Sequence, residues 1–395
     1  MKLNPYFADL DESYFFSEMR ARTDAYAAMH PDEHLYRMGI GDVTQPLCPA
    51  VIQGLMRGVR DQSTMETFHG YLFECGTDFL RSAIAEHYAT RGVTLFPEEI
   101  FITSGAGDEI GALGDLFSSD NTVLVTEPAY PAYVDTSIMG GRRIVHLPSG
   151  KADGFLPMPV PDLKADLIFL CSPNNPTGAA YTKAQLKEWV DYANTQEAVI
   201  LFDAAYEAFI TDSDVPHSIF EIDGAERCAI EICSLSKTAG FTGTRCGYTI
   251  VPNALIRNGQ SLRALWVRSR TTKTNGISYI LQRGAEAVFT PAGQAQTKAS
   301  IAVYQENARI WMDALDRAGL WYTGGRNAPY IWVACPNGRS SWAMFDLLLT
   351  KAQIIVTPGV GFGACSEGFF RISMFSEPSE ASAAAERFLS LMQTL

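Results

Sequence analysis

Residues 166–206 read DLIFLCSPNNPTGAAYTKAQLKEWVDYANTQEAVILFDAAY. One apolar run opens this stretch and a second closes it, and residues 182–196 between them have the periodicity of an amphipathic helix. Short apolar runs that end in polar, Gly or Pro residues are typical of strands buried on both faces of a sheet. A strand, a helix and a second strand in this order predict a parallel β-α-β unit.

The same alternation extends over residues 98–252. Other short apolar runs in this range are EIFIT (99–103), TVLVTE (122–127), RRIVHL (142–147) and CAIEICS (228–234). We therefore predict an α/β fold with a mostly parallel central sheet and helices on both of its faces. Ligands of such sheets bind beyond the carboxyl ends of the strands, so the residues that follow the strands are the candidates for a site.

The C-terminal part has a different pattern. From about residue 288 we expect a helix over 289–318, strands over 330–334 and 369–373, and a closing helix over 380–395. Helices beside a small sheet predict a second, smaller α+β domain built from both chain ends. The expected division is an N-terminal arm and part of the small domain in 1–45, a large domain in 46–287, and the small domain in 288–395.

Composition limits the kinds of partner. The 395 residues are 47% hydrophobic, and 31 Lys and Arg against 44 Asp and Glu give a formal net charge of −13. This balance argues against a nucleic acid or an anionic membrane as partner. No signal-peptide pattern opens the sequence and no apolar run is long enough to span a bilayer, so we expect a cytoplasmic protein. The eight scattered cysteines predict reduced thiols and no metal site.

A glycine-rich turn follows the run at 99–103. Residues 104–107 are Ser-Gly-Ala-Gly and open a predicted helix. Glycines in such a turn allow backbone N–H groups to approach an anion at a helix N-terminus. Gly105, Ala106 and Gly107 are therefore candidates for anion binding, although turns of this kind also occur for packing alone.

Two polar side chains end the strands of the opening stretch. Asn175 lies in Ser-Pro-Asn-Asn-Pro-Thr-Gly (172–178), where two prolines and a glycine predict a rigid turn. Asp203 ends an apolar strand, where an unpaired carboxylate would be costly. Asp203 is therefore expected to have a cationic partner such as a pyridinium N1–H, the alternative being a capping role in a loop.

Lys237 lies in Ser-Leu-Ser-Lys-Thr-Ala-Gly-Phe-Thr-Gly-Thr-Arg (234–245), directly after a predicted strand. A lysine at the mouth of a sheet, with Arg245 nearby, should have a lowered pKa, which favours imine formation. Ser234, Ser236 and Arg245 are potential phosphate donors.

The chain resembles the fold-type I aminotransferases of class I and II in the order and spacing of six residues: Asn175, Asp203, Tyr206, Lys237, Arg245 and, in FFRIS (369–373), Arg371. This resemblance implies pyridoxal 5′-phosphate (PLP) as cofactor and Lys237, Asp203 and Tyr206 as catalytic residues. Lys237 would hold PLP as a Schiff base and then move a proton between substrate and cofactor. Asp203 would keep the pyridinium protonated, so that the ring acts as an electron sink.

The resemblance also implies the remaining contacts. Asn175 and Tyr206 would hydrogen-bond the ring oxygen O3′, Tyr130 would stack on the ring, and Arg371 would clamp the substrate α-carboxylate. The groups around the phosphate would be the backbone of Gly105, Ala106 and Gly107, the side chains of Ser234, Ser236 and Arg245, and Tyr71 from a neighbouring subunit.

Longer motifs are similar to those of the LL-diaminopimelate aminotransferase family, from about residue 3 to the end: GIGDVTQP (39–46), CSPNNPTGAA (171–180), AGFTGTR (239–245), NAPYIWV (327–333) and TPGVGFG (357–363). That family transfers an amino group reversibly between LL-2,6-diaminopimelate with 2-oxoglutarate and tetrahydrodipicolinate with glutamate, in lysine and cell-wall precursor biosynthesis. The resemblance implies a homodimer with shared active sites. It also implies substrate contacts from Tyr14, Gly41, Asn175 and Arg371, with Glu66 and Asn275 reaching across the dimer.

Two positions depart from that family. Gly107 stands where the family has a lysine, and Leu72 stands where it has a glycine. Either change is compatible with another substrate, such as aspartate or an aromatic amino acid, and the Glu66–Asn275 pair is the discriminating feature. A non-catalytic regulatory protein on the same fold is a more remote alternative, because such proteins usually lose the lysine.

Overall fold

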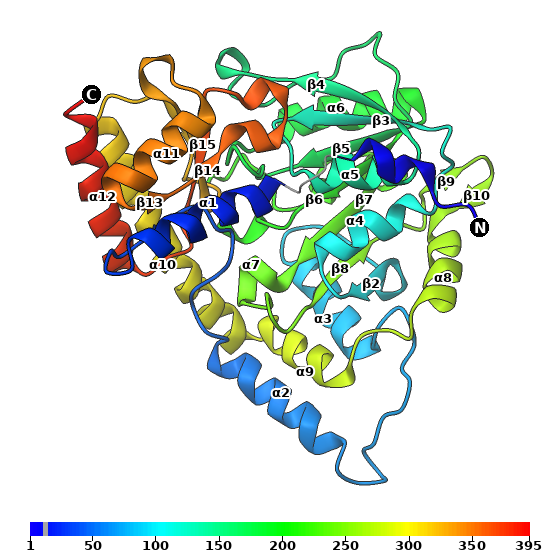
Figure 1. Cartoon of the computed structure of the whole chain (residues 1–395). Coiled ribbons are helices and arrows are strands. Elements are labelled where there is room, and N and C mark those ends of the chain that lie inside the picture. Colours follow the sequence, from blue (N-terminus) through cyan, green and yellow to red (C-terminus); the bar gives the residue numbers. More distant parts are fainter. Residues whose placement is uncertain (11–14) are drawn as a thin grey trace.

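A computed structural model describes residues 1–10 and 15–395. Its centre is a seven-stranded sheet with helices on both faces (Figure 1). In spatial order the strands are β2 (Ile100–Thr103), β8 (Gly247–Ile250), β7 (Ala229–Ser234), β6 (Val199–Asp203), β5 (Leu167–Cys171), β3 (Thr122–Glu127) and β4 (Arg143–Pro148). All neighbouring pairs are parallel except those of β8, which runs antiparallel to β2 and β7. The predicted α/β class and mostly parallel sheet are confirmed.

The sheet forms because its strands are apolar on both faces. In β5, Leu167 and Phe169 belong to the apolar core that includes α4 (Ala106–Gly114), α5 (Ala132–Met139) and α8 (Leu262–Lys273). Ile168 and Leu170 point the other way, into the core that includes α3 (Asp78–Ala89), α6 (Lys183–Gln196) and α9 (Tyr279–Val288). This alternation follows from the two-residue period of a strand. It explains why the strands read as continuous apolar runs.

Local signals set the bounds of the connecting helix in the opening stretch. The Oγ1 of Thr182 accepts from the backbone N–H of Gln185, and the Gln185 side chain accepts from the N–H of Thr182. This capping box starts α6, and Glu197 in the left-handed conformation ends it. The predicted range 182–196 therefore agrees with the helix to within one residue.

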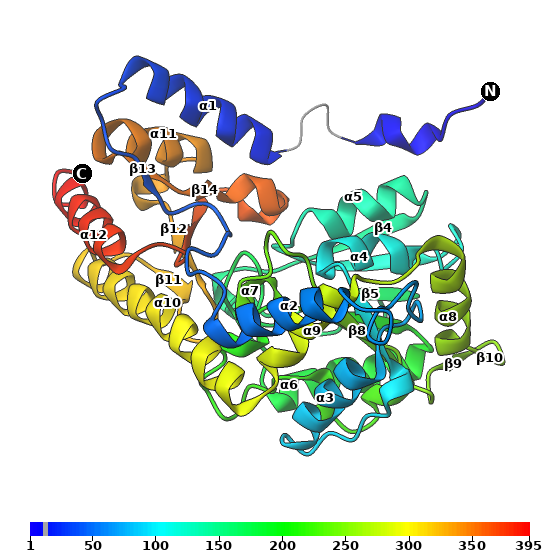
Figure 2. The ribbon, with the colours of Figure 1, turned by 90° about the horizontal axis from the view of Figure 1, so that it is seen from below.

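A second, smaller sheet has the antiparallel order β11 (Tyr322–Gly324), β12 (Tyr330–Ala334), β15 (Phe369–Ser373) and β14 (Thr357–Pro358). The long helix α10 (Pro291–Arg317) packs against the closing helix α12 (Pro378–Met392), and α11 (Ser341–Ala352) lies beside both α12 and the small sheet (Figures 1 and 2). The remaining elements are the helices α1 (Phe15–Met29), α2 (Pro49–Asp61) and α7 (Leu235–Ala239) and the short strands β1 (Tyr36–Arg37), β9 (Ile256–Arg257), β10 (Gln260–Ser261) and β13 (Ile354–Ile355). The division of the chain at residues 45 and 287 stays a prediction.

The N-terminal segment divides between the two parts of the molecule. Strand β1 pairs with β13 in a separate two-stranded sheet, and Arg22 of α1 stacks over Trp342 of α11, so α1 and β1 pack beside the elements of the C-terminal part. The short 3-10 helix Pro5–Asp9 instead packs against α5, and the side chain of Asn4 donates to the carbonyl of Met139 there (2.9 Å). The first residues therefore contact the large sheet's helical layer rather than the small domain.

Two further findings concern the chain as a whole. Within the described residues, no helix is long and apolar enough to cross a membrane. All eight cysteines carry free thiols, and six of them are buried.

A buried ion pair ties the glycine-rich turn to its surroundings. Nη1 of Arg270, on α8, lies 2.8 Å from Oε1 of Glu109, on α4, and Nη2 of Arg270 donates to the carbonyl of Ile102 at 3.1 Å. Thr249 adds a hydrogen bond to the other oxygen of Glu109. These contacts fix the first turn of α4 relative to β2.

Arg270→Leu should lower the free energy of unfolding by about 3–5 kcal/mol, because it leaves the buried Glu109 carboxylate without its cation. Thermal and denaturant unfolding followed by circular dichroism measure the change. The matched control is Arg317→Leu, which removes an exposed pair with Asp313 and should cost about 0–1 kcal/mol. An equal decrease in the free energy of unfolding in the two variants would contradict the proposed contribution of the buried pair to stability.

Candidate active site

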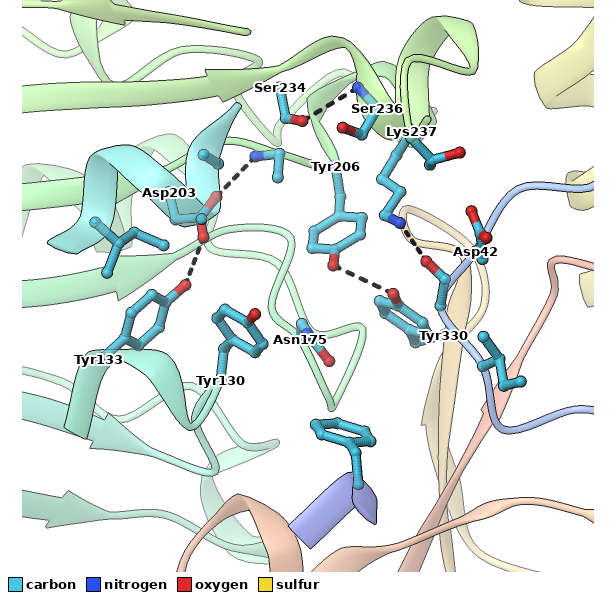
Figure 3. Close-up of a pocket in the computed structure, with 18 of the residues that line it drawn as sticks. Asp42, Tyr130, Tyr133, Asn175, Asp203, Tyr206, Ser234, Ser236, Lys237 and Tyr330 are labelled. Carbon is cyan, nitrogen blue, oxygen red and sulfur yellow. Dashed lines mark hydrogen bonds between the residues drawn. The ribbon is translucent and has the colours of Figure 1, made fainter. Parts of the chain in front are cut away.

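A cavity of about 480 Å³ lies at the carboxyl ends of β5, β6 and β7. Figure 3 shows side chains from separate elements pointing into it. Of the residues proposed from the sequence, it brings together Gly41, Ala106, Gly107, Tyr130, Asn175, Asp203, Tyr206, Ser234, Ser236, Lys237, Arg245 and Arg371. The parallel register explains the gathering, because Cys171 of β5 pairs with Asp203 of β6, which pairs with Ile232 of β7.

Lys237 lies on α7, a short helix that begins directly after β7. Ser234 caps this helix by accepting from the backbone N–H of Ser236 (3.1 Å). The Nζ of Lys237 donates to the carbonyl of Gly41. Burial lowers the pKa of Lys237 to about 8, with Arg371 and Arg245 acting in the same direction and Asp42 opposing them. About a tenth of the amine is therefore neutral at pH 7, far more than for a lysine with the ordinary pKa, and this favours nucleophilic attack.

Asp203 is buried at the end of β6. Its Oδ2 accepts from the Tyr133 hydroxyl at 2.6 Å, and its Oδ1 accepts from the backbone N–H of Ala205 at 3.0 Å. Burial raises the pKa of Asp203, and these two hydrogen bonds partly offset the effect. Tyr133 is itself held by stacking on Phe169, with ring centroids 4.7 Å apart. The carboxylate is thus fixed in place, and a pyridinium N–H at the cavity would give it the cationic partner that the sequence predicts.

The glycine-rich turn and Arg245 form a cradle for an anion. A Cβ on Gly105 would lie 2.7 Å from Nη2 of Arg245, and Gly105 has a φ of +126°, so only glycine lets the guanidinium approach the turn this closely. Nη1 of Arg245 donates to Ser236 Oγ at 3.3 Å. A guanidinium, serine hydroxyls and the N-terminus of α4 fit a phosphate group.

Gly107 lies beside this cradle in open space. Apart from its chain neighbours and the backbone of its own helix, no atom of the described chain lies within 4 Å of the position that its Cβ would take. The absence of a lysine here is therefore not a steric requirement of the surrounding structure.

Arg371 approaches the cavity from β15 of the small sheet. Nη1 donates to Asn175 Oδ1 at 2.5 Å and Nη2 donates to the carbonyl of Gly39 at 2.8 Å. The guanidinium lies over the ring of Tyr330, 4.3 Å from its centroid. Its Nε is buried and has no hydrogen-bond partner among the residues that the structure describes. A buried, oriented guanidinium with an unused donor fits a carboxylate, which accepts from the fork of Arg in a bidentate manner.

Several cavity residues were not predicted from the sequence. The hydroxyl of Tyr133 donates to Asp203. The hydroxyl oxygens of Tyr330 and Tyr206 lie 3.2 Å apart. Asp42 and Phe16 line the cavity wall. Tyr133 lies near the start of α5, three residues after Tyr130 in the Tyr-Pro-Ala-Tyr motif, and this proximity in the sequence could have suggested it. Phe16, by contrast, arrives from α1, and no local pattern places it.

Five proposed residues are not among those that line this cavity: Gly105, which lies against Arg245, and four others. Tyr14 lies outside the described residues. Glu66, Tyr71 and Asn275 are exposed on the loops after α2 and after α8. The two loops meet, because a Cβ on Gly276 would lie 3.3 Å from the carbonyl oxygen of Phe73. The three side chains are thus exposed on these loops and are not among the residues that line the chain's own cavity.

Within the part of the chain that the structure describes, no three His, Cys, Asp or Glu side chains gather in a way that could hold a metal ion.

The family model for class I and II aminotransferases matches residues 33–388. The chain belongs to this family. Within it, the LL-diaminopimelate aminotransferase of Lachnospira eligens is 46% identical to this aminotransferase, over 99% of the chain and 100% of the relative. The LL-diaminopimelate aminotransferase of Bacteroides fragilis is also 46% identical, over 98% of both chains. The predicted family is confirmed.

Solved structures agree. The L,L-diaminopimelate aminotransferase from Chlamydomonas reinhardtii superimposes with a TM-score of 0.92 at 38% identity, covering 98% of each chain. An aspartate aminotransferase from Thermus thermophilus, 20% identical, has a TM-score of 0.86 and shows the common fold. The chain is thus an enzyme that transfers amino groups between small amino acids and oxo acids.

Tyr133→Phe should reduce the aminotransferase activity about tenfold, because it removes a hydrogen bond to a buried carboxylate. Loss of this donor raises the pKa of Asp203 further, so the acidic limb of the pH–activity profile should move to higher pH. Steady-state rates between acidic and neutral pH measure the shift.

The control is Tyr181→Phe, which removes another buried hydroxyl, hydrogen-bonded to the carbonyl of Pro157 away from the cavity. It should leave the acidic limb in place. A Tyr133→Phe enzyme with an unshifted profile would show that Tyr133 does not act through Asp203.

Proposed function

We propose that this aminotransferase uses PLP and interconverts LL-2,6-diaminopimelate and 2-oxoglutarate with tetrahydrodipicolinate and glutamate. The observation that carries the proposal is the single cavity in which Lys237, Asp203, Arg245 and Arg371 meet. The similarity to LL-diaminopimelate aminotransferases over nearly the whole chain supports the choice of substrate.

The cavity residues fit PLP at each of its polar ends. Arg245, Ser234, Ser236 and the backbone of residues 105–107 would bind the phosphate. Asp203 would accept from the pyridine N1–H, and Tyr130 would lie against the ring. Asn175 and Tyr206 would donate to the ring oxygen O3′. PLP, when bound, supplies an electron sink for the bond to hydrogen at the substrate Cα.

Lys237 would supply the nucleophile and then carry the proton. Its amine has a pKa near 8, so it can take up a proton from the substrate Cα and return it without a large free-energy cost. The short α7 helix fixes the backbone of Lys237, and the carbonyl of Gly41 orients the amine.

Arg371 would hold the substrate α-carboxylate. Its contacts with Asn175 and Gly39 and its position over Tyr330 fix the plane of the guanidinium before the substrate arrives. Such preorganisation reduces the entropy lost on binding. Phe16 and Tyr330 line the same cavity and would exclude water from the reacting atoms.

The homodimer is part of this proposal. Large apolar side chains are exposed along α2 and the loop after it: Ile52, Met56, Val59, Met65, Phe68, Tyr71 and Phe73. Met65 is 89% exposed and Tyr71 is 90% exposed. Contiguous apolar surface of this kind marks an interface, and a twofold dimer would cover it with a second copy of the chain.

A second copy would also explain Glu66 and Asn275. The far end of LL-2,6-diaminopimelate carries an ammonium and a carboxylate. The carboxylate of the partner's Glu66 and the amide of the partner's Asn275 would pair with these groups. An aminotransferase for an aromatic amino acid would need an apolar pocket in that place. Gly107 and Leu72 differ from the residues of the LL-diaminopimelate aminotransferase family at these positions. Because of these differences, another amino acid such as aspartate is the alternative substrate.

The substrate is tested by a screen of amino donors with 2-oxoglutarate as acceptor. LL-2,6-diaminopimelate should give the highest kcat/KM, and Glu66→Gln should lower it while changing the rate with aspartate little. High activity with aspartate or an aromatic donor, and none with LL-2,6-diaminopimelate, would refute the substrate while leaving the aminotransferase itself intact. In a Lys237→Ala variant, the visible absorbance of lysine-bound PLP should vanish and turnover should fall by at least about a hundredfold.

The shared site is tested by mixing two impaired variants, Lys237→Ala and Tyr71→Ala. If Tyr71 crosses to the other subunit, each mixed dimer contains one site with both native residues, and activity should rise above that of either variant alone. Subunits are exchanged by dilution and reconcentration, and activity is followed with time. If activity does not recover in dimers that are shown to be mixed, Tyr71 contributes to the active site of its own subunit or to no active site.

A further inference from the structure

A second cavity, of about 530 Å³, lies beside the one described above. It is enclosed by the C-terminal end of α3, the segment after β6, the C-terminal end of α9 and the N-terminal half of α10. Ser234 lines both cavities, so the β7–α7 junction separates them. Neither the aminotransferase reaction nor the proposed dimer uses this space.

One wall carries a fixed ionic network. Nη2 of Arg91 lies 3.0 Å from Oε2 of Glu207, and Nδ1 of His217 lies 3.1 Å from the same oxygen. Burial alone would raise the pKa of Glu207, but Arg91 and His217 outweigh it and hold the pKa at about 2. The carboxylate is therefore charged and already engaged by its two neighbours.

Lys298 and His87 are two of the cavity's polar residues with an unpaired group. Lys298, on α10, has no ion-pair or hydrogen-bond partner anywhere in residues 1–10 and 15–395. Nδ1 of His87 is buried and likewise lacks a hydrogen-bond partner in the described chain. Burial and then Arg91 lower the pKa of His87, so its imidazole is neutral at neutral pH. Arg91 and Lys298 against Glu207 leave one uncompensated positive charge in the cavity.

The rest of the lining mixes polar side chains, such as Thr211, Gln294 and Thr297, with several large apolar ones. Ile210, Leu235, Val288, Phe289 and Ile301 face the space. A concave site of several hundred Å³ with apolar walls and a few convergent polar groups is the usual form of a small-molecule site. The single excess charge and the open hydrogen bond define the polar end of such a molecule.

We propose that this second cavity binds a small carboxylate with an apolar body. Its carboxylate pairs with Lys298, the cation of the cavity that has no partner in the described chain. Its apolar part packs between Phe289 and Ile301. A small molecule seated here would lie against the other side of the junction that carries Ser234 and Lys237. The inference does not depend on the proposed substrate, because the two cavities share only that junction.

Benzoate is the probe, and benzamide is its neutral isostere. Each is titrated into the holoenzyme by isothermal titration calorimetry. The reference protein and all variants carry Arg371→Ala. This substitution removes the proposed substrate clamp, so that benzoate bound at the active site does not contribute to the signal. Benzoate should bind at one site per chain, and benzamide should bind at least about tenfold more weakly, since it lacks the charge-assisted contact.

Three variants locate the site. Lys298→Gln should weaken benzoate binding about tenfold, because it removes the unpaired cation. Ala208→Phe should abolish binding by filling the cavity, and circular dichroism checks that it folds. Arg309→Gln, on the same helix but paired with Glu306 and outside the cavity, is the matched control and should leave binding unchanged.

No binding of benzoate, or binding that Lys298→Gln leaves unchanged, would overturn the proposal. Equal binding of benzoate and benzamide would overturn the assignment of a carboxylate. Lys298 is exposed, so its variant tests the proposal even if Ala208→Phe does not fold.

Discussion

Three cationic side chains face one sheltered cavity in this molecule, and their proximity constrains the rest of the site. Lys237 comes from α7, Arg245 from the loop after it, and Arg371 from the small sheet. Burial and the two guanidinium groups lower the pKa of Lys237 to about 8, while Asp42 partly compensates. The repulsion has two consequences: it keeps a nucleophilic amine available, and it makes the cavity a receptor for anions at both ends.

The fold supplies the rigidity that such a cluster needs. Adjacent parallel strands end side by side, which places Asn175, Asp203 and Lys237 on neighbouring connections. The buried Arg270–Glu109 pair fixes the helix that offers its N-terminus to the phosphate. Arg371 belongs to the small sheet but donates to Asn175, in the turn that follows β5 of the large sheet, so the clamp spans the two parts of the molecule. A movement between those parts would therefore change the position of the substrate relative to Lys237.

Much of this arrangement could be predicted from the sequence. Strands buried on both faces are continuous apolar runs, and polar residues that follow them, such as Asp203 and Lys237, must meet at one edge of the sheet. Strand β8 escaped prediction because Gly247–Ile250 is short and follows a glycine-rich segment directly. Tyr330 and Phe16 could not be placed, since they reach the cavity through packing between distant segments. The roles of Glu66, Tyr71 and Asn275 depend on a second chain, and a single chain leaves them exposed on its surface.

The account rests on the claim that one cofactor contacts Lys237, Asp203 and Arg245 of the first cavity at once. A crystal structure of the protein purified with PLP tests this claim most directly. We expect continuous density from Lys237 Nζ into the cofactor, the pyridine N1 against Asp203, and the phosphate between Gly105 and Arg245 with the partner subunit's Tyr71 beside it. A cofactor whose phosphate lies away from Arg245, or whose ring nitrogen does not reach Asp203, would contradict the account.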